Sequence, residues 1–157
     1  MVRRPVVRRS LTPAERALLD GVRRAVLATI RPDGTPRLVP IGFVARDRED
    51  GALELWSSLD EKPKADGDPR DLARVRDVLG RPDVAVLVDR WSEDWSELAW
   101  LRLGGTARLV EPADIPADVA PALRARYPQY GTHDLEGRPA LAIAITTVSS
   151  WGLGDPS

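Results

Sequence analysis

The chain has 157 residues, of which 43% are hydrophobic and 30% are charged, and its formal net charge is −1. This composition is typical of one globular domain and argues against a protein built to bind nucleic acid, which carries a basic excess. The absence of cysteine and the single histidine, His133, exclude disulfides, cysteine nucleophiles and multi-histidine metal sites.

The N-terminal segment Met1–Ser10 is basic and has no apolar stretch after its arginines, unlike a secretory signal peptide. We expect a flexible basic arm there, followed by one domain over residues 11–157. The longest apolar run, Ala140–Ile145, is too short to span a bilayer. These features predict a cytoplasmic protein without membrane contact.

Most of the chain reads as short strands separated by turn residues. The expected strands, in chain order, are Ala25–Ile30, Thr35–Val44, Ala52–Ser58, Val84–Val88, Glu97–Val110 and Arg138–Val148. Mostly antiparallel strands with few helices predict a mainly β fold, a small barrel. Val84–Val88 is continuously apolar, so both of its faces should be buried. Gly104 and Gly105 predict a bulge in the next strand.

The second expected strand contains two prolines, Pro36 and Pro40. Proline has no N–H group to donate to a neighbouring strand. A central antiparallel strand does not accept two such residues. This strand should therefore be an edge, bulged, or turned toward a ligand.

Two helices carry clear start signals. Thr12 and Glu15 form a capping box at the first helix. Asp68 is the expected N-cap of a second helix over Pro69–Leu79. A short third helix should end near Arg126. The stripe of the second helix that should be buried consists of Leu72, Val75, Val78 and Leu79.

The stretch Leu53–Lys64 reads as a strand that ends in a polar turn and a Lys-Pro-Lys sequence. Lys62 and Lys64 are the only lysines among 23 basic residues. A compact ammonium suits a phosphate group, and Pro63 would hold the two charges in a fixed arrangement. The alternative is a solvated loop with two exposed lysines.

Arg70 and Arg74 lie one helical turn apart, a spacing at which like charges repel. Either a bound anion or the neighbouring Asp71 and Asp77 should compensate them.

The segment between Val88 and Leu101 carries three of the five tryptophans, Trp91, Trp95 and Trp100. Large aromatic side chains pack in cores and are enriched at subunit contacts. The sequence leaves both alternatives open.

The order of these segments resembles a known family. AVLATIRPDGTPRLVPIGFV, LELWSSLDEKPK, PRDLARVRDVL and RPDVAVLVDRW are similar to the split-barrel flavin and deazaflavin oxidoreductases, relatives of pyridoxamine phosphate oxidase. VDRWSEDWSELAWLRLGGTARL and RYPQY resemble a subgroup that uses the deazaflavin coenzyme F420. The likeness covers about Leu11–Trp151 and depends on the order and spacing of the segments.

The resemblance implies a six-stranded antiparallel split barrel that works as a homodimer, with its cofactor in a groove between the subunits. It implies that the cofactor ring is lined by Leu27, Ala28, Thr29, Val39, Pro40 and Ile41. The residues implied for the cofactor phosphate are Ser57, Ser58, Lys62 and Lys64, with Arg70 or Arg74 nearby. Trp95 and Trp100 would contribute from the partner subunit.

The expected function is an F420-dependent oxidoreductase that transfers a hydride between reduced deazaflavin and a small organic acceptor. The alternatives are an FMN-dependent oxidase or reductase and a non-catalytic flavin- or deazaflavin-binding protein. The coenzyme carries this chemistry, so no catalytic triad and no metal are expected, and His133 should be a loop residue. Asp66 and Asp68 follow the lysines, and their carboxylates would weaken a phosphate site.

Overall fold

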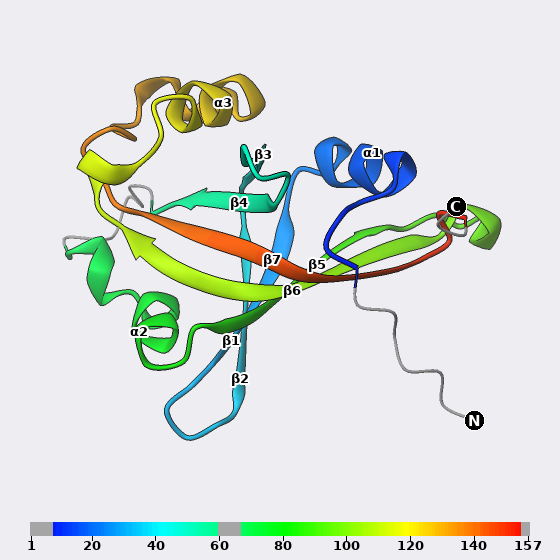
Figure 1. Ribbon diagram of the computed structural model, residues 1–157, viewed down its shortest axis with the longest axis horizontal. Coiled ribbons are helices and arrows are strands. Elements are labelled where there is room, and N and C mark those ends of the chain that lie inside the picture. Colours follow the sequence, from blue (N-terminus) through cyan, green and yellow to red (C-terminus); the bar gives the residue numbers. More distant parts are fainter. Residues whose placement is uncertain (1–7, 60–66, 155–157) are drawn as a thin grey trace.

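Seven strands form one sheet within residues 8–59 and 67–154, which the computed structural model describes. Neighbouring strands lie in the order β2-β1-β5-β6-β7-β4-β3, and each pairing is antiparallel (Figure 1). The strands are β1 (Ala25–Ile30), β2 (Pro36–Ile41), β3 (Val44–Asp47), β4 (Leu53–Ser58), β5 (Asp83–Arg90), β6 (Ala99–Val110) and β7 (Ala140–Trp151).

The sheet is open, so the expectation of a six-stranded barrel is wrong. The expected strand Thr35–Val44 is divided at Gly42 and Phe43 into β2 and β3, which form the two opposite edges of the sheet. Of the three alternatives for a strand with two prolines, the edge position is confirmed. Because Pro36 and Pro40 have no N–H to donate, β2 is suited to having only one partner strand.

Three helices and several short 3-10 turns connect the strands. The α-helices are α1 (Pro13–Gly21), α2 (Ala73–Gly80) and α3 (Val119–Arg126). The expected cap of α1 is confirmed, because Thr12 Oγ1 accepts the backbone N–H of Glu15 at 3.2 Å. Asp68 caps a separate 3-10 turn, η1 (Pro69–Asp71), because the extended backbone of Leu72 divides the expected helix in two.

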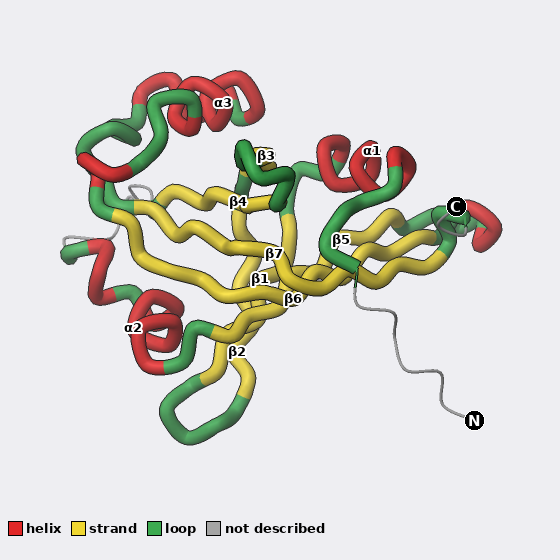
Figure 2. The backbone as a smooth tube through the Cα atoms, in the orientation of Figure 1, coloured by secondary structure: helices red, strands yellow, loops and turns green. Residues whose placement is uncertain are grey.

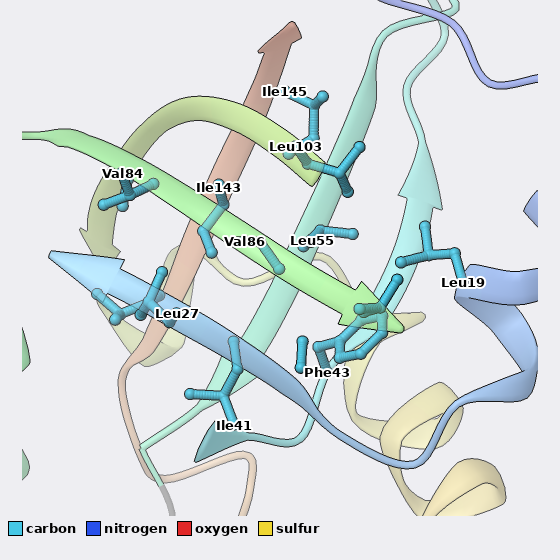
Figure 3. Close-up of a cluster of buried hydrophobic side chains, with 14 of the residues drawn as sticks. Leu19, Leu27, Ile41, Phe43, Leu55, Val84, Val86, Leu103, Ile143 and Ile145 are labelled. Carbon is cyan, nitrogen blue, oxygen red and sulfur yellow. The ribbon is translucent and has the colours of Figure 1, made fainter. Parts of the chain in front are cut away.

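The main core lies on one face of the curled sheet, which we call the inner face (Figure 3). Leu18 and Leu19 of α1, with Val75 and Val78 of α2, pack into it. Leu79, expected in the same stripe, is 64% exposed, because the short α2 turns that residue away from the sheet. The strand residues at its centre include Leu27, Leu55, Val86, Leu103 and Ile143.

A second cluster covers the opposite, outer face near the ends of β4, β6 and β7. Trp56 of β4 lies in it at 1% exposure, against Val119 and Leu123 of α3. The helices therefore divide between the two faces: α1 and α2 contribute to the inner core, and α3 covers one end of the outer face. Figure 2 shows the three helices at separate places around the sheet.

The expected bulge is confirmed between Gly104 and Gly105, where the pairing of β6 with β7 changes register. A Cβ added to Gly105 would lie 2.0 Å from the backbone oxygen of Ala144, so only glycine permits this close approach.

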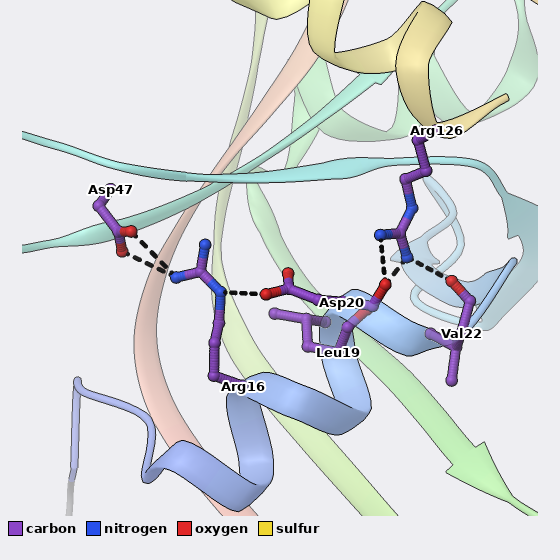
Figure 4. A network of polar contacts seen from close by, with 6 residues as sticks. All are labelled: Arg16, Leu19, Asp20, Val22, Asp47 and Arg126. Carbon is purple, nitrogen blue, oxygen red and sulfur yellow. Dashed lines mark hydrogen bonds and ion pairs between the residues drawn. The ribbon is translucent and has the colours of Figure 1, made fainter.

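Arg126 of α3 joins two helices that are far apart in the sequence (Figure 4). Its guanidinium donates to the backbone oxygens of Asp20 at 2.7 Å and Leu19 at 3.1 Å, and also to that of Val22. These carbonyls lie at the end of α1, where backbone acceptors lack helical partners and a cation is favourable.

The described end of the N-terminal arm is attached to the domain. Arg8 pairs with Val148 as an isolated bridge and donates to buried Glu15 at 2.8 Å. Met1–Val7 lie outside the described residues. Within the ranges that are described, no helix is both long and apolar enough to cross a membrane.

Candidate functional site

Part of the outer face carries none of the described helices, because α1 and α2 pack on the inner face and α3 covers only the end at β4. We call this part the open face. Strand alternation directs every second side chain to it. Its residues come from β2, β1, β5, β6 and β7, and are Leu38, Pro40, Val26, Ala28, Ala85, Leu87, Trp100, Arg102, Gly104 and Trp151.

A row of small residues crosses the open face. Ala28 pairs with Ala85, and Ala85 pairs with Gly104, so these three lie side by side on adjacent strands. Leu38 pairs with Ala28 and ends the row on the β2 side. At the other end Thr147 leans over Gly104, since a Cβ there would lie 2.3 Å from Thr147 Oγ1. The row forms a shallow, mostly apolar strip.

The ring-lining residues expected from the family do not all share this face. Ala28 and Pro40 point to the open face, whereas Leu27 and Ile41 are buried in the inner core. Val39 packs against the same core, and Thr29 is 1% exposed. Because side chains alternate along a strand, consecutive residues cannot all present side chains to one ligand.

Thr29 is occupied by a buried polar network. Its hydroxyl donates to Asp77 Oδ2 at 2.7 Å, and Arg37 Nε donates to the same oxygen at 2.7 Å. Burial alone would raise the pKa of Asp77, but the hydrogen bonds from Arg37 and Thr29 outweigh it, so the pKa is lowered. Asp77 is therefore the ionised partner of Arg37, a pairing between residues 40 positions apart that no local pattern indicates.

The expected phosphate residues are only partly brought together. Ser57 and Ser58 are both buried at the end of β4, but as neighbours in a strand they point to opposite faces. Lys62 and Lys64 lie outside the described residues. Arg74 is also buried, at 8% exposure.

Arg70 already has two anionic partners. It contacts Asp68 at 3.0 Å, and its Nε donates to Glu111 Oε1 at 3.0 Å. Glu111 stands at the end of β6, and sequence reasoning missed it because it is 41 residues away along the chain. The expected compensation of Arg70 by neighbouring Asp71 is replaced by Asp68 and Glu111.

A small cavity of about 230 Å³ lies between η1 and the segment that precedes β7. The backbone N–H of Leu59 donates to the oxygen of Pro139 at 3.3 Å, which fixes the point where the chain leaves β4. The cavity contains two arginines and one aspartate, and is lined by Gly67, Pro69, Arg70, Asp134, Gly137, Arg138 and Pro139.

A larger groove of about 570 Å³ lies at the β7 end of the open face. Trp100 and Trp151 are directly paired across β6 and β7, and Trp91 adds a third indole. Arg102 lies over the Trp100 ring, with its guanidinium carbon 5.1 Å from the ring centroid. We call this the tryptophan groove; it is lined by Leu87, Asp89, Arg90, Trp91, Leu98, Ala99, Trp100, Arg102 and Trp151.

Two expectations about this region are corrected. Core packing is wrong for Trp91 and Trp95, which are 69% and 72% exposed, so of the two alternatives only the subunit contact stays a prediction for them. Burial of both faces of Val84–Val88 is also wrong, because Leu87 is 42% exposed on the open face. Trp151 was not predicted to line a site. Strand alternation places it on the opposite face of β7 from Val148, three residues earlier, and this was a usable signal.

His133 lies in a loop directly after a 3-10 turn, as expected, with its ring edge-on to Tyr130 at 5.6 Å. Among the residues that the structure describes, no group of side chains is arranged to hold a metal ion.

Several solved structures share this fold. A conserved hypothetical protein, Rv2991, from Mycobacterium tuberculosis superposes with a TM-score of 0.67 at 22% sequence identity, over 98% of this chain and 94% of that chain. HutZ, the heme storage protein from Vibrio cholerae, gives 0.61 at 16% identity over 90% and 93% of the two chains. General stress protein 26 from Bacillus anthracis gives 0.58 at 19% over 90% and 93%.

These similarities are low in sequence and show the fold alone. No functionally curated protein matches the sequence. A family match, by contrast, spans residues 11–152, nearly the whole chain, and includes every described strand and helix. The chain therefore belongs to the pyridoxamine 5'-phosphate oxidase family.

Proposed function

We propose that the protein is an oxidoreductase that uses the deazaflavin coenzyme F420 to reduce a small organic acceptor. Members of its family commonly bind the flavin FMN. The choice of F420 over FMN follows from the resemblance of the segments around Trp91–Val110 and Arg126–Tyr130 to the deazaflavin-using subgroup. One structural observation supports a ring-binding role for either coenzyme: the shallow strip of small residues on the open face.

The strip fits a flat ring system. Ala28 and Ala85 project only methyl groups, so a planar molecule can lie across β1 and β5 without displacing side chains. Leu38 and Leu87 stand beside the strip and are 69% and 42% exposed. A ring bound there would cover part of their apolar surface, which is favourable by about 25 cal/mol per Å².

A bound flavin or deazaflavin supplies the hydride chemistry, in which the acceptor gains two electrons. The chain's own residues bind and orient the ring and exclude water from it. The titratable groups nearest the strip on the open face are Asp83 and Arg102, two residues along their strands from Ala85 and Gly104, and neither lies in the row of small residues. We therefore assign no acid or base to the chain, and solvent provides the remaining proton of the reduction.

We propose that a second copy of the chain covers the strip on the open face and completes the cofactor groove. Exposed apolar patches of this kind mark contact surfaces. The patch includes Leu38 and Leu87, which flank the strip. Trp95, at 72% exposure, is then free to reach the partner's groove, in agreement with the role implied by the family.

One observation favours the alternative of a binding protein without catalysis. Asp68 and Glu111 already neutralise Arg70 beside the expected phosphate site. A competing carboxylate lowers the net attraction for a phosphate, so cofactor affinity should be moderate.

Three measurements separate these functions. Bound FMN, seen as a yellow protein after purification, would favour the FMN alternative. Saturable binding of reduced F420, followed by its oxidation when an acceptor is added, supports the proposal. Binding of F420 without turnover across a broad acceptor panel would favour the non-catalytic binding protein. Failure of the protein to bind either coenzyme would overturn the ring-binding role.

A further inference from the structure

The tryptophan groove is chemically different from the strip beside it. It is walled by Trp91, Trp100 and Trp151, whereas the strip is made of alanine and glycine. Its volume of about 570 Å³ lies within the range of small-molecule sites, about 300–1,000 Å³. Indole faces favour flat conjugated rings, which stack on them with offset or edge-on geometry.

The groove also carries an unneutralised cation. Arg102 is exposed, and its guanidinium lies over the Trp100 ring without an ion pair to any carboxylate in the described parts of the chain. The second arginine, Arg90, uses its Nε to bind the backbone oxygen of Glu97 at 2.7 Å. Asp89 is the one carboxylate in the lining, so two arginines and one aspartate leave a net charge of +1. A ligand with an anionic group complements this charge.

The groove is continuous with the strip. Leu87 and Arg102 pair with each other, and each lies two residues along its strand from the strip residues Ala85 and Gly104. Two residues of extended strand on one face span about 7 Å. A molecule in the groove would therefore adjoin a ring that lies on the strip.

We propose that the tryptophan groove binds the acceptor itself, a planar conjugated molecule that carries a carboxylate or a similar oxyanion. Trp100 and Trp151 stack on its ring, and Arg102 pairs with its anionic group. This inference rests on the proposed function only where it identifies the bound molecule as the acceptor. Binding of an aromatic anion is a property of the groove and requires no coenzyme.

The test uses 2-naphthoate as the probe and coenzyme-free protein, with binding measured by calorimetry at pH 7. Two probes of similar size act as controls: 2-naphthalenemethanol keeps the rings without the charge, and cyclohexanecarboxylate keeps the charge without the aromatic rings. We expect saturable binding of 2-naphthoate, with about tenfold weaker binding of each control.

Variants assign this binding to the groove. Arg102→Gln should weaken 2-naphthoate about tenfold and leave 2-naphthalenemethanol unchanged. Arg76→Gln is the matched control, because Arg76 is exposed on α2, away from the open face, and it should bind like wild type. Trp151→Leu should weaken both aromatic probes, with circular dichroism confirming that the variant is folded.

Several results would overturn the inference. Absence of saturable binding, or equal affinities of the Arg102 and Arg76 variants, would mean that the groove is no such site. If 2-naphthoate fails to bind and Trp151→Leu converts a dimer to a monomer, a second copy fills the groove instead. Failure of the proposed function is a separate result: 2-naphthoate would bind, but neither coenzyme would.

Discussion

The guanidinium of Arg70 and the carboxylate of Glu111 form a two-point ion pair that connects η1 to the end of β6. Nε donates to Oε1 at 3.0 Å, and Nη2 donates to Oε2. The hydrogen bond from Arg70 lowers the pKa of Glu111, so this carboxylate is ionised throughout the neutral range. Glu111 therefore competes directly with any phosphate for Arg70.

We expect Glu111→Gln to bind a phosphate-bearing coenzyme more tightly, because it releases Arg70 from one of its two anionic partners. The gain should be at most about fivefold, since exposed ion pairs contribute about 0–1 kcal/mol. Titration of FMN and of F420 at low salt measures it. Asp47→Asn is the matched control, because Asp47 pairs with Arg16 of α1 and neither residue lines the cavity at Arg70. Equal affinities of the two variants would separate Arg70 from the phosphate site.

The two lysines provide a stronger test of the same site. If Lys62 and Lys64 contact the phosphate, Lys62→Ala and Lys64→Ala should each weaken coenzyme binding about ten- to hundredfold. The loss should be largest at low salt, where charges are least screened. Asp66→Asn should strengthen binding slightly. Wild-type affinity in both lysine variants would mean that this segment is the solvated loop of the alternative interpretation.

The strip on the open face is tested by Ala28→Phe. The side chain of residue 28 points away from the core, so the domain should still fold, but a phenyl group would stand where the ring is expected to lie. We expect coenzyme affinity to fall at least about tenfold, since overpacking of this kind costs about 1–3 kcal/mol. Ala125→Phe, at an exposed position of α3, is the control. Unchanged affinity in a folded Ala28→Phe variant would place the ring elsewhere.

The proposed homodimer is tested by light scattering, which at low micromolar concentration should report twice the chain mass. Leu38→Glu places a charge within the expected contact and should shift the protein toward the monomer. Leu79→Glu changes an equally exposed leucine on α2, outside the open face, and should leave the dimer intact. A monomeric wild type would contradict both the dimer and a groove shared by two subunits.

The network around Asp77 predicts an acid-sensitive contribution to stability. Its pKa is lower in the folded protein than the value of about 4 in an unfolded chain. The stabilisation is therefore complete above about pH 4 and is lost as pH falls through the folded value. Asp77→Asn should lower the free energy of unfolding by about 1–3 kcal/mol at pH 7.

Urea denaturation between pH 7 and pH 2 provides the measurement. The wild type should lose stability more steeply below pH 4 than Asp77→Asn does. Asp83→Asn, which changes an exposed carboxylate at the start of β5, should follow the wild type. Parallel curves for all three proteins would show that the contacts to Thr29 and Arg37 contribute nothing to folding.

Features that depend on near neighbours were readable from the sequence. The cap at Thr12 and the bulge at Gly104 and Gly105 were predicted correctly, and an edge position was one of the alternatives predicted for the strand with two prolines. Each depends on local chemistry: a hydroxyl beside a free N–H, the missing Cβ of glycine, or the missing N–H of proline. The order of such segments along the chain also predicted the family.

Features that depend on contacts between distant segments were decided only by the tertiary structure. Alternation shows that Leu27 and Ala28 point to opposite faces, but not which face the helices cover. The exposed Leu87 and Trp151 follow from where α1, α2 and α3 pack, and the pairing of Arg70 with Glu111 joins residues 41 positions apart. Burial and long-range ion pairs result from the packing of the whole chain, because no local pattern specifies the partner.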